Sequence, residues 1–248
     1  MDEALELGTY LPQSCANASE QAYLDFLWSA FQTNYEAERF EFASLAFHLL
    51  YMSFVSFSIW QIRLARPERF AMAMVGFRSG DEGLLMDCES PFKFYERLKE
   101  AQIFRFMKLI GCNNEQIGEF SKFVKRRNKI AHPSGTVFFN DHVAIDDEIA
   151  EMMNEVRNIE EHMRQVVLEL YESFLCGDSS DPDLRQYPDY KDEVRVNLVH
   201  KNYMSVADIA YCRTLDIAVL HDQPNFDEIQ ALHTALLVSY PDEEAEAA

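Results

Sequence analysis

The stretch that decides the fold is residues 145–176, IDDEIAEMMNEVRNIEEHMRQVVLELYESFLC. Its apolar residues recur at alternating intervals of four and three positions: Ile145, Ile149, Met152, Val156, Ile159, Met163, Val166 and Leu170. Because an α-helix has 3.6 residues per turn, this spacing places all of them on one face. The pattern lasts about four heptads, up to Cys176, and predicts one long amphipathic helix that packs against other helices.

Two further helices are predicted before this stretch. Asn17 and Glu20 have the spacing of a capping box, so they are expected to begin a helix. A second, long helix is predicted from about Ala37 to Leu64. Its residues 43–62 carry no formal charge but include four serines, one histidine and one glutamine. This section is therefore predicted to be a buried central helix rather than a transmembrane helix.

Shorter signals fill the region between residues 64 and 132. Pro67 is expected to begin a short helix, because proline suits the first helical position. Residues 78–91, RSGDEGLLMDCESP, hold two Gly and a Pro and are predicted to be a loop. Helix-start and helix-stop residues then predict two more helices, at 90–111 and 113–132.

The composition is typical of a folded helical protein. Of the 248 residues, 48% are apolar, with only 8 Gly and 8 Pro. This excludes a disordered chain, and so few turn-forming residues argue against an all-β barrel or sandwich. Five widely spaced cysteines indicate a reduced chain, and the acidic N-terminus has no features of a signal peptide. We therefore expect an all-α, cytoplasmic protein that does not span a membrane.

A domain boundary is predicted near residue 177. The segment GDSSDPDLRQYPDY, residues 177–190, is polar and holds two prolines, as linkers do. Residues 1–177 are predicted to form a bundle of four to five helices. Residues 178–248 are predicted to hold the linker and a small, mostly helical C-terminal region with an acidic tail. Within that region a short strand is predicted by the alternation of Val194, Val196 and Leu198.

Charge is unevenly distributed along the chain. The net charge of −20 argues against a surface that binds polyanions all round. Residues 93–132 nevertheless hold ten bases and four acids, a balance of +6 that leaves −26 for the rest. A solvated helix face is the simplest interpretation of a charge run. Its densest part, KRRNK at 125–129, lies close to His132, which makes this segment a candidate polyanion site.

The segment SKFVKRRNKIAHPSG, residues 121–135, places its polar residues unevenly around a helix. At 100° per residue, an apolar stripe is defined by Ile117, Phe120, Val124 and Ala131. Arg127 falls within this stripe, whereas Arg126 is expected to point to the opposite side. Arg127, Asn128 and His132 are predicted to converge where the helix meets a partner surface, surrounded by Lys125, Arg126 and Lys129.

An arginine in an apolar stripe needs an anionic partner. If that partner is a carboxylate on a neighbouring helix, Arg127 is structural. If it is a phosphate, the guanidinium can bind it with two hydrogen bonds. His132 precedes a proline and is therefore expected at or just past the last turn of its helix. A single histidine is usually structural, but the neighbouring Arg127 and Asn128 make this one a candidate for acid–base chemistry.

In these residues the chain resembles the HEPN (higher eukaryote and prokaryote nucleotide-binding) family. The family signature is an Arg followed, after four to six residues, by a His near the end of a bundle helix. Arg127 and His132 match it with four residues between them, and Asn128 is the polar residue that usually follows the Arg. Arg126 would match with five intervening residues but is not followed by such a polar residue. One toxin subgroup has a Tyr where this chain has Ser134, so the partnership of that subgroup is not implied.

The resemblance extends over residues 18–176 at the level of the bundle and is close over residues 113–135. It implies an all-α, HEPN-like bundle acting as a metal-independent endoribonuclease, without a cofactor, in a homodimer whose two motifs form one cleft. RNA would be cleaved to 2′,3′-cyclic phosphate and 5′-OH ends. The catalytic residues implied are Arg127, Asn128 and His132, and the RNA-binding residues Lys125, Arg126 and Lys129. Many relatives are toxins or defence effectors, which implies an antitoxin or regulatory protein as a partner.

Two other functions fit the same residues. One is a non-catalytic HEPN bundle that binds RNA, a nucleotide or a protein partner, with Arg127 and His132 as structural or ligand contacts. The other is a protein-interaction or inhibitor subunit that uses the acidic helix 145–176 and the C-terminal helices. The long apolar stripe of that helix suits packing within one chain as well as dimerisation.

Overall fold

The computed structural model describes residues 1–75, 81–132, 135, 138 and 141–242. Over these residues the chain forms helices and no β-strand, and its β-type pairing is a single isolated bridge between Pro12 and Ser205. The predicted all-α fold class is therefore confirmed.

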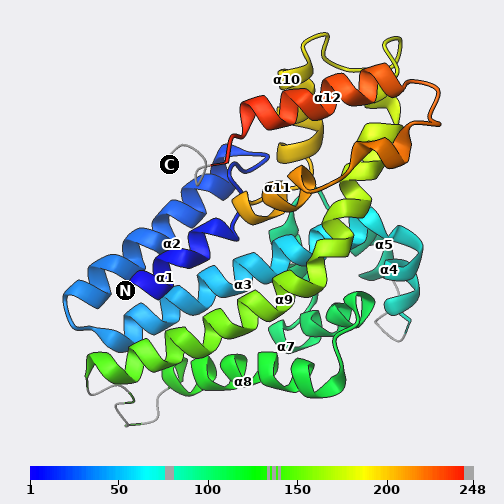
Figure 1. Ribbon diagram of the computed structural model, residues 1–248. Helices are drawn as coiled ribbons and strands as arrows, with labels where there is room; N and C mark the ends of the chain where they lie inside the picture. The colour runs from blue at the N-terminus through cyan, green and yellow to red at the C-terminus, as the bar shows by residue number, and fades with distance from the viewer. Residues whose placement is uncertain (76–80, 133–134, 136–137, 139–140, 243–248) are drawn as a thin grey trace.

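Four helices of at least 18 residues, among those described, form the body of the molecule (Figure 1): α2 (Ala18–Glu36), α3 (Phe40–Ala65), α8 (Asn114–Ala131) and α9 (His142–Cys176). Helix α3 packs against each of the other three and is buried on nearly every face from Ala43 to Arg63. By length and composition alone it could cross a membrane, but 83% of its most apolar window is buried inside the protein. The prediction of a buried central helix is confirmed.

The sequence signals for helix starts act as predicted. The Asn17 side chain accepts a hydrogen bond from the Glu20 backbone N–H (3.0 Å) at the start of α2. Asn113 and Gln116 form a reciprocal capping box at the start of α8, with distances of 3.0 and 2.8 Å. The side chain of Asp141 caps α9, which therefore begins three residues earlier than its apolar pattern. These caps satisfy N–H groups that have no partner inside the helix.

The segment between α3 and α8 is more broken than predicted. Helix α4 (Pro67–Ala73) begins at Pro67 as expected, but α5 (Asp81–Met86) lies within the predicted loop 78–91, part of which falls outside the described residues. The single helix expected over 90–111 is wrong. The structure has four short helical pieces instead: η2 (Pro91–Lys93), α6 (Phe94–Arg97), α7 (Glu100–Ile103) and η3 (Phe104–Ile110).

The reason for this break is the distribution of apolar residues. On one straight helix, Phe94 and Ile103 would lie on opposite faces, yet both are fully buried. Extended backbone at Leu98 and Lys99 separates α6 from α7 and lets both faces pack inward. The same break brings Glu100, the first residue of α7, toward α3 and α8.

The C-terminal residues are helical as well: η4 (Asp178–Ser180), α10 (Tyr190–Glu193), the π-helix η5 (Val194–His200), α11 (Val206–Arg213), η6 (Ile217–Leu220) and α12 (Phe226–Ser239). The strand predicted over 194–198 is therefore wrong. Val194, Leu198 and Val199 are the buried residues of η5. Leu198 and Val199 lie four and five positions after Val194, a spacing that suits a helix. Alternation over five residues was too short to distinguish the two.

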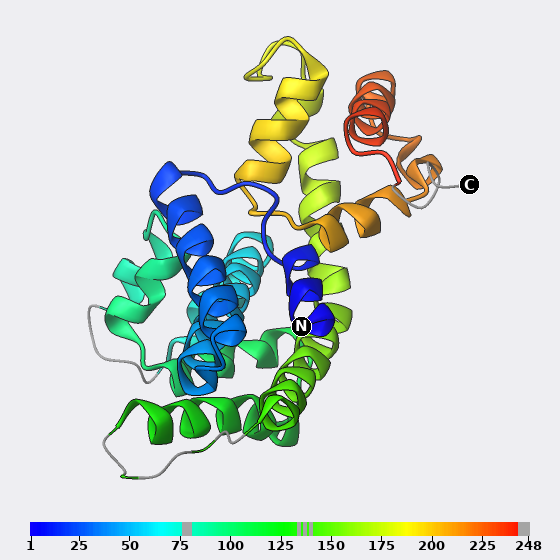
Figure 2. The same cartoon turned by 90° about the vertical axis from the view of Figure 1, so that its left-hand side faces the viewer.

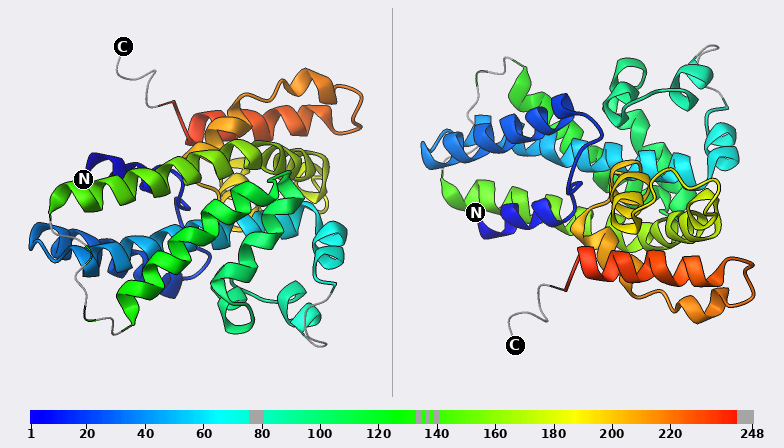
Figure 3. Two further views of the ribbon diagram at one scale, coloured as in Figure 1. Left: turned by 90° about the horizontal axis from the view of Figure 1, so that it is seen from below. Right: turned by 90° about the horizontal axis from the view of Figure 1, so that it is seen from above.

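The C-terminal helices gather around the C-terminal half of α9 (Figure 2), while α1 (Asp2–Glu6) and the short η1 (Leu7–Thr9) lie along α9 nearer its middle. Seen from below and from above (Figure 3), α12 and the segment from α4 to α7 lie on opposite sides of the long helices. Hydrogen bonds join the C-terminal region to the bundle, for example from Trp60 Nε1 to the Lys201 carbonyl (3.3 Å) and between Tyr171 Oη and His233 Nδ1 (2.7 Å).

Two buried carboxylic acids lie where α11 packs on α9. Asp208 accepts hydrogen bonds from Gln61 Nε2 (2.9 Å) and from the Ser205 backbone N–H (2.8 Å). Glu160 is also buried, and within the described part of the chain its Oε1 has no hydrogen-bond partner. Burial raises the pKa of Glu160 well above its usual range, and the charge of Asp208 raises it further. Burial raises the pKa of Asp208 too, but the hydrogen bonds from Ser205 and Gln61 oppose that rise, so Glu160 is the member of the pair that holds a proton more strongly.

We expect Glu160→Gln to raise the free energy of unfolding at pH 8 by about 1–3 kcal/mol, because the neutral amide avoids the free-energy cost that a buried carboxyl with a raised pKa carries at that pH. Because the folded-state pKa of Glu160 is raised, wild-type stability falls as the pH rises from the ordinary value of about 4.5 through the folded-state value. Gln cannot ionise, so the advantage of the variant should fade toward pH 4.5. Thermal unfolding at both pH values measures this effect. The exposed Glu161→Gln is the control, and a lower Tm of Glu160→Gln at pH 8 would contradict the assignment.

Candidate functional site

Helix α8 lies against α3, α7, η3 and α9, and its buried residues are Phe120, Phe123 and Val124. Ala131, which was expected in the apolar stripe, is exposed. Because Phe123 is buried and Ala131 is not, the buried face is rotated relative to the predicted stripe. Arg127 still falls on that face, where 25% of its side chain is exposed.

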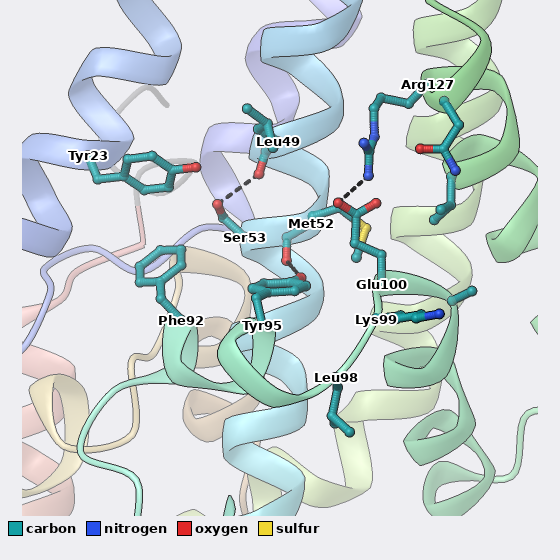
Figure 4. A pocket seen from close by; sticks show the side chains of 13 residues that line it. Tyr23, Leu49, Met52, Ser53, Phe92, Tyr95, Leu98, Lys99, Glu100 and Arg127 are labelled. Atoms are coloured by element: carbon teal, nitrogen blue, oxygen red, sulfur yellow. Dashed lines mark hydrogen bonds and ion pairs between the residues drawn. The ribbon is translucent and has the colours of Figure 1, made fainter. Parts of the chain in front are cut away.

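Arg127 is held by an acid from another element. Its Nη2 forms an ion pair with Glu100 Oε1, as the dashed line in Figure 4 shows. The second carboxylate oxygen of Glu100 lies 3.2 Å from Nε2 of His48, a fully buried residue of α3. Three helices, α3, α7 and α8, thus each supply one member of a His48–Glu100–Arg127 chain. The carboxylate partner that was expected on a neighbouring helix if Arg127 is structural is present, and it lies on the short helix α7.

The charge states of the linked side chains His48 and Glu100 follow from their burial and from their contacts. Burial by itself would raise the pKa of Glu100, but the hydrogen bonds of its carboxylate with His48 and Arg127 outweigh this and lower the pKa to about 2. Burial lowers the pKa of His48, and Glu100 offsets only part of that effect. At neutral pH, His48 is therefore neutral and Glu100 is ionised. Arg127 Nε is buried and has no hydrogen-bond partner among the described residues.

A cavity of about 630 Å³ opens beside Arg127. Figure 4 shows the rings of Tyr23, Phe92 and Tyr95 on one side of it, with Arg127 and Glu100 on the other. The remaining lining includes Asn128, Lys99, Ser53 and several aliphatic side chains. The cavity therefore combines an aromatic side with a charged side, as small-molecule and nucleotide sites commonly do.

The structure brings two of the three predicted catalytic residues together. Arg127 and Asn128 both line the cavity. His132 does not line it: it follows the last residue of α8, its backbone is extended (φ −102°, ψ 144°), and its side chain is exposed. Its backbone N–H donates to the Asn128 carbonyl (3.1 Å), so it lies one turn beyond Asn128. The predicted helix end at His132 is confirmed; Pro133 and Ser134 lie outside the described residues.

The three predicted RNA-binding residues differ in their surroundings. Lys125 and Lys129 are exposed, and within the described part of the chain their side chains have no hydrogen-bond or ion-pair partner. Arg126 instead forms ion pairs with Glu151 (2.9 Å) and Glu148 (3.6 Å) of α9. The expectation that Arg126 points away from the packed face is therefore wrong. The buried Phe123 extends that face toward α9, and Arg126 lies at its edge.

Sequence reasoning missed the residues that complete the site. Glu100 was counted only as one of four acids in a basic region, and His48 only as a polar residue in a core helix. They lie 27 and 79 positions before Arg127, so no local spacing connects them to it. The aromatic side of the cavity, from α2 and from the segment of η2 and α6, had no signal either.

No group of three or more His, Cys, Asp or Glu side chains within the described residues is placed to hold a metal ion. The chain matches no protein-family model, no curated protein and no solved structure in the comparisons made with them. An assignment of function therefore depends on the chemistry of the residues at this site.

Proposed function

We propose that the protein is a metal-independent endoribonuclease of the HEPN type. Arg127, Asn128 and His132 would act on the phosphate at which RNA is cut. The ends produced would be a 2′,3′-cyclic phosphate and a 5′-OH. A toxin or defence role in the cytoplasm, restrained by an antitoxin or other regulatory protein, belongs to the same proposal.

The chemistry needs a proton acceptor, a proton donor and a cation near the phosphate. A neutral His132 takes the proton of the ribose 2′-OH while the 2′-oxygen bonds to phosphorus. The bond from phosphorus to the 5′-oxygen breaks, and that oxygen receives a proton from the imidazolium of His132 of the partner subunit. Arg127 stabilises the charge on the phosphate oxygens. Because His48 is fully buried behind Glu100, His132 is the exposed histidine at this site within the described residues, so the mechanism takes its second histidine from a partner subunit and calls for a homodimer.

The observation that carries this proposal is the placement of Arg127. It lies at the edge of a cavity, fixed by Glu100, with its Nε unpartnered among the described residues. An exposed histidine follows one turn after Asn128, and two cations that have no partner among the described residues, Lys125 and Lys129, lie on the exposed side of the same helix. An anionic polymer could therefore reach an arginine, a histidine and two lysines along α8.

One observation favours a second candidate, a non-catalytic bundle that binds RNA or a nucleotide. The Glu100 carboxylate already neutralises Arg127 in the structure. An arginine whose charge is already balanced by a carboxylate has less of that charge available to stabilise a transition state, but it can still donate hydrogen bonds to a ligand. In this function His132 would be a surface residue without a chemical role.

Incubation of the purified full chain with total RNA in the presence of EDTA separates these functions. For the ribonuclease we expect defined fragments that end in 2′,3′-cyclic phosphate, since no metal ion takes part. RNA binding without cleavage would support the binding module. Sedimentation at micromolar concentration tests the dimer, because a monomer that cleaves RNA at full rate would contradict the composite site.

A further inference from the structure

The cavity beside Arg127 is larger, and its lining more varied, than a contact with a single phosphate requires. A single phosphate occupies one guanidinium, whereas this cavity of about 630 Å³ is within the range that encloses a whole small ligand. Its two sides also differ in chemistry, with three aromatic rings facing the charged residues (Figure 4).

The aromatic side is fixed by its own contacts. Tyr23 of α2 and Phe92 of η2 meet edge to face, with ring centres 5.3 Å apart. Tyr95 Oη donates a hydrogen bond to the Met52 carbonyl (2.6 Å), which holds its ring against α3. Tyr23 remains 37% exposed, so its ring is open to a ligand. Fixed rings of this kind bind the flat faces of nucleobases, each worth about 1–3 kcal/mol.

The polar side presents groups that read the edge of a base. Asn128 lines the cavity, and its side-chain amide has no hydrogen-bond partner among the described residues. Glu100 keeps a carboxylate in the cavity wall, fixed by His48 and Arg127. An asparagine amide pairs with the amino group and N7 of adenine, and a carboxylate accepts from the amino group of cytosine. Both residues favour a base that presents an amino group at C6 of a purine or C4 of a pyrimidine, as adenine and cytosine do.

We propose that this cavity is a base-recognition pocket that receives adenine or cytosine from the nucleotide next to the cleaved bond. This inference rests on the proposed ribonuclease function. Stacking on Tyr23 and Tyr95 holds the base, Asn128 and Glu100 select its amino group, and the attached phosphate reaches Arg127. Uracil carries a carbonyl oxygen at C4 and guanine at C6, and the Glu100 carboxylate repels that oxygen when the base presents this edge; the amino group of guanine lies on the other edge of its ring.

The first test measures binding without cleavage. Calorimetry with the four nucleoside 3′-monophosphates on the full-length His132→Ala variant should show adenosine and cytidine monophosphates binding more tightly than the other two. Tyr23→Leu should weaken the binding of adenosine monophosphate by about 5- to 100-fold. Phe26→Leu is the matched control, because Phe26 is an exposed aromatic residue of the same helix that does not line the cavity. Equal binding of all four nucleotides, unaffected by Tyr23→Leu, would overturn the pocket.

The second test maps cleavage sites in RNA by sequencing, for wild type, Tyr23→Leu and Phe26→Leu. We expect sites next to adenine or cytosine in wild type and Phe26→Leu, and a loss of that preference in Tyr23→Leu. Cleavage without base preference would overturn the pocket while leaving the ribonuclease intact. Selective nucleotide binding without any RNA cleavage would refute the ribonuclease and leave a nucleotide-binding pocket, so the two failures are distinguishable.

Discussion

His132→Ala is expected to lower the rate of RNA cleavage by about 10²- to 10⁴-fold, the usual contribution of a general acid or base. The Tm should stay within about 2 °C of wild type, because exposed side chains away from packing contacts contribute little to stability. The His132 side chain is exposed and has no hydrogen-bond or ion-pair partner among the described residues. Cleavage of a labelled RNA under single-turnover conditions with EDTA, alongside thermal unfolding, measures both quantities.

His221→Ala is the matched control for this variant. His221 is also exposed, lies beside Asp222 and belongs to the distant C-terminal region, so its loss should change neither activity nor stability. Full activity in folded, contaminant-free His132→Ala protein would refute the mechanism. A mixture of wild-type chains with an excess of His132→Ala chains gives a further test of the composite site, since each mixed dimer keeps only one of the two histidines that the mechanism uses. Such mixtures should be less active than the same amount of wild-type protein alone.

The parts of the fold that the sequence predicts are those governed by local pattern. The apolar period of α9 and the uncharged section of α3 each depend on one helix and its burial, and both predictions hold. The segment 90–111 fails because its apolar residues face several partners at once, and only tertiary packing decides where the chain must break. The few apolar residues of η5 fit both the two-residue period of a strand and the longer period of a helix, so the pattern alone could not exclude a strand.

The predictions about the candidate site also divide into those set by a local pattern and those set by tertiary packing. Arg127 and Asn128 lie three and four positions after Val124 on one helix, so helical geometry places all three beside the same cavity. The pairing of Arg127 with Glu100, and of Glu100 with His48, depends on how three separate helices pack. No rule of spacing within a sequence contains that information.

The structure also shows which cations of the basic segment, residues 93–132, are paired with acids and which are exposed. Its balance of +6 already counts Glu100, the partner of Arg127, but it overstates the positive charge available to RNA, because Glu151 and Glu148 from outside the segment pair with Arg126. Lys125 and Lys129 remain as exposed cations on α8. An acidic body with few free cations would repel RNA from most of its surface and accept it along this helix. The net charge of −20 is then compatible with one local RNA site.

Arg127→Ala is expected to lower the cleavage rate by about 10²- to 10³-fold, the usual effect of removing a group that stabilises transition-state charge. Arg127→Lys should not restore the rate. In the structure Nη2 of Arg127 is committed to Glu100, and the rest of the guanidinium must bind the phosphate. A lysine has a single ammonium group, which Glu100 would hold, so it cannot serve both partners.

The Glu100→Gln background decides whether Arg127 acts on RNA or only supports Glu100. Gln keeps the size of the side chain but removes the charge that Arg127 neutralises. If Arg127 were only a structural partner, its loss would cost little in this background, because no carboxylate would be left unpaired. If Arg127 binds the phosphate, Arg127→Ala should still lower cleavage by about 10²-fold in the double variant. Single-turnover rates and Tm values for wild type, the two single variants and the double variant complete the cycle. A cleavage loss that disappears in the double variant, together with the loss of Tm, would make Arg127 structural and leave His132 without the cation that its chemistry needs.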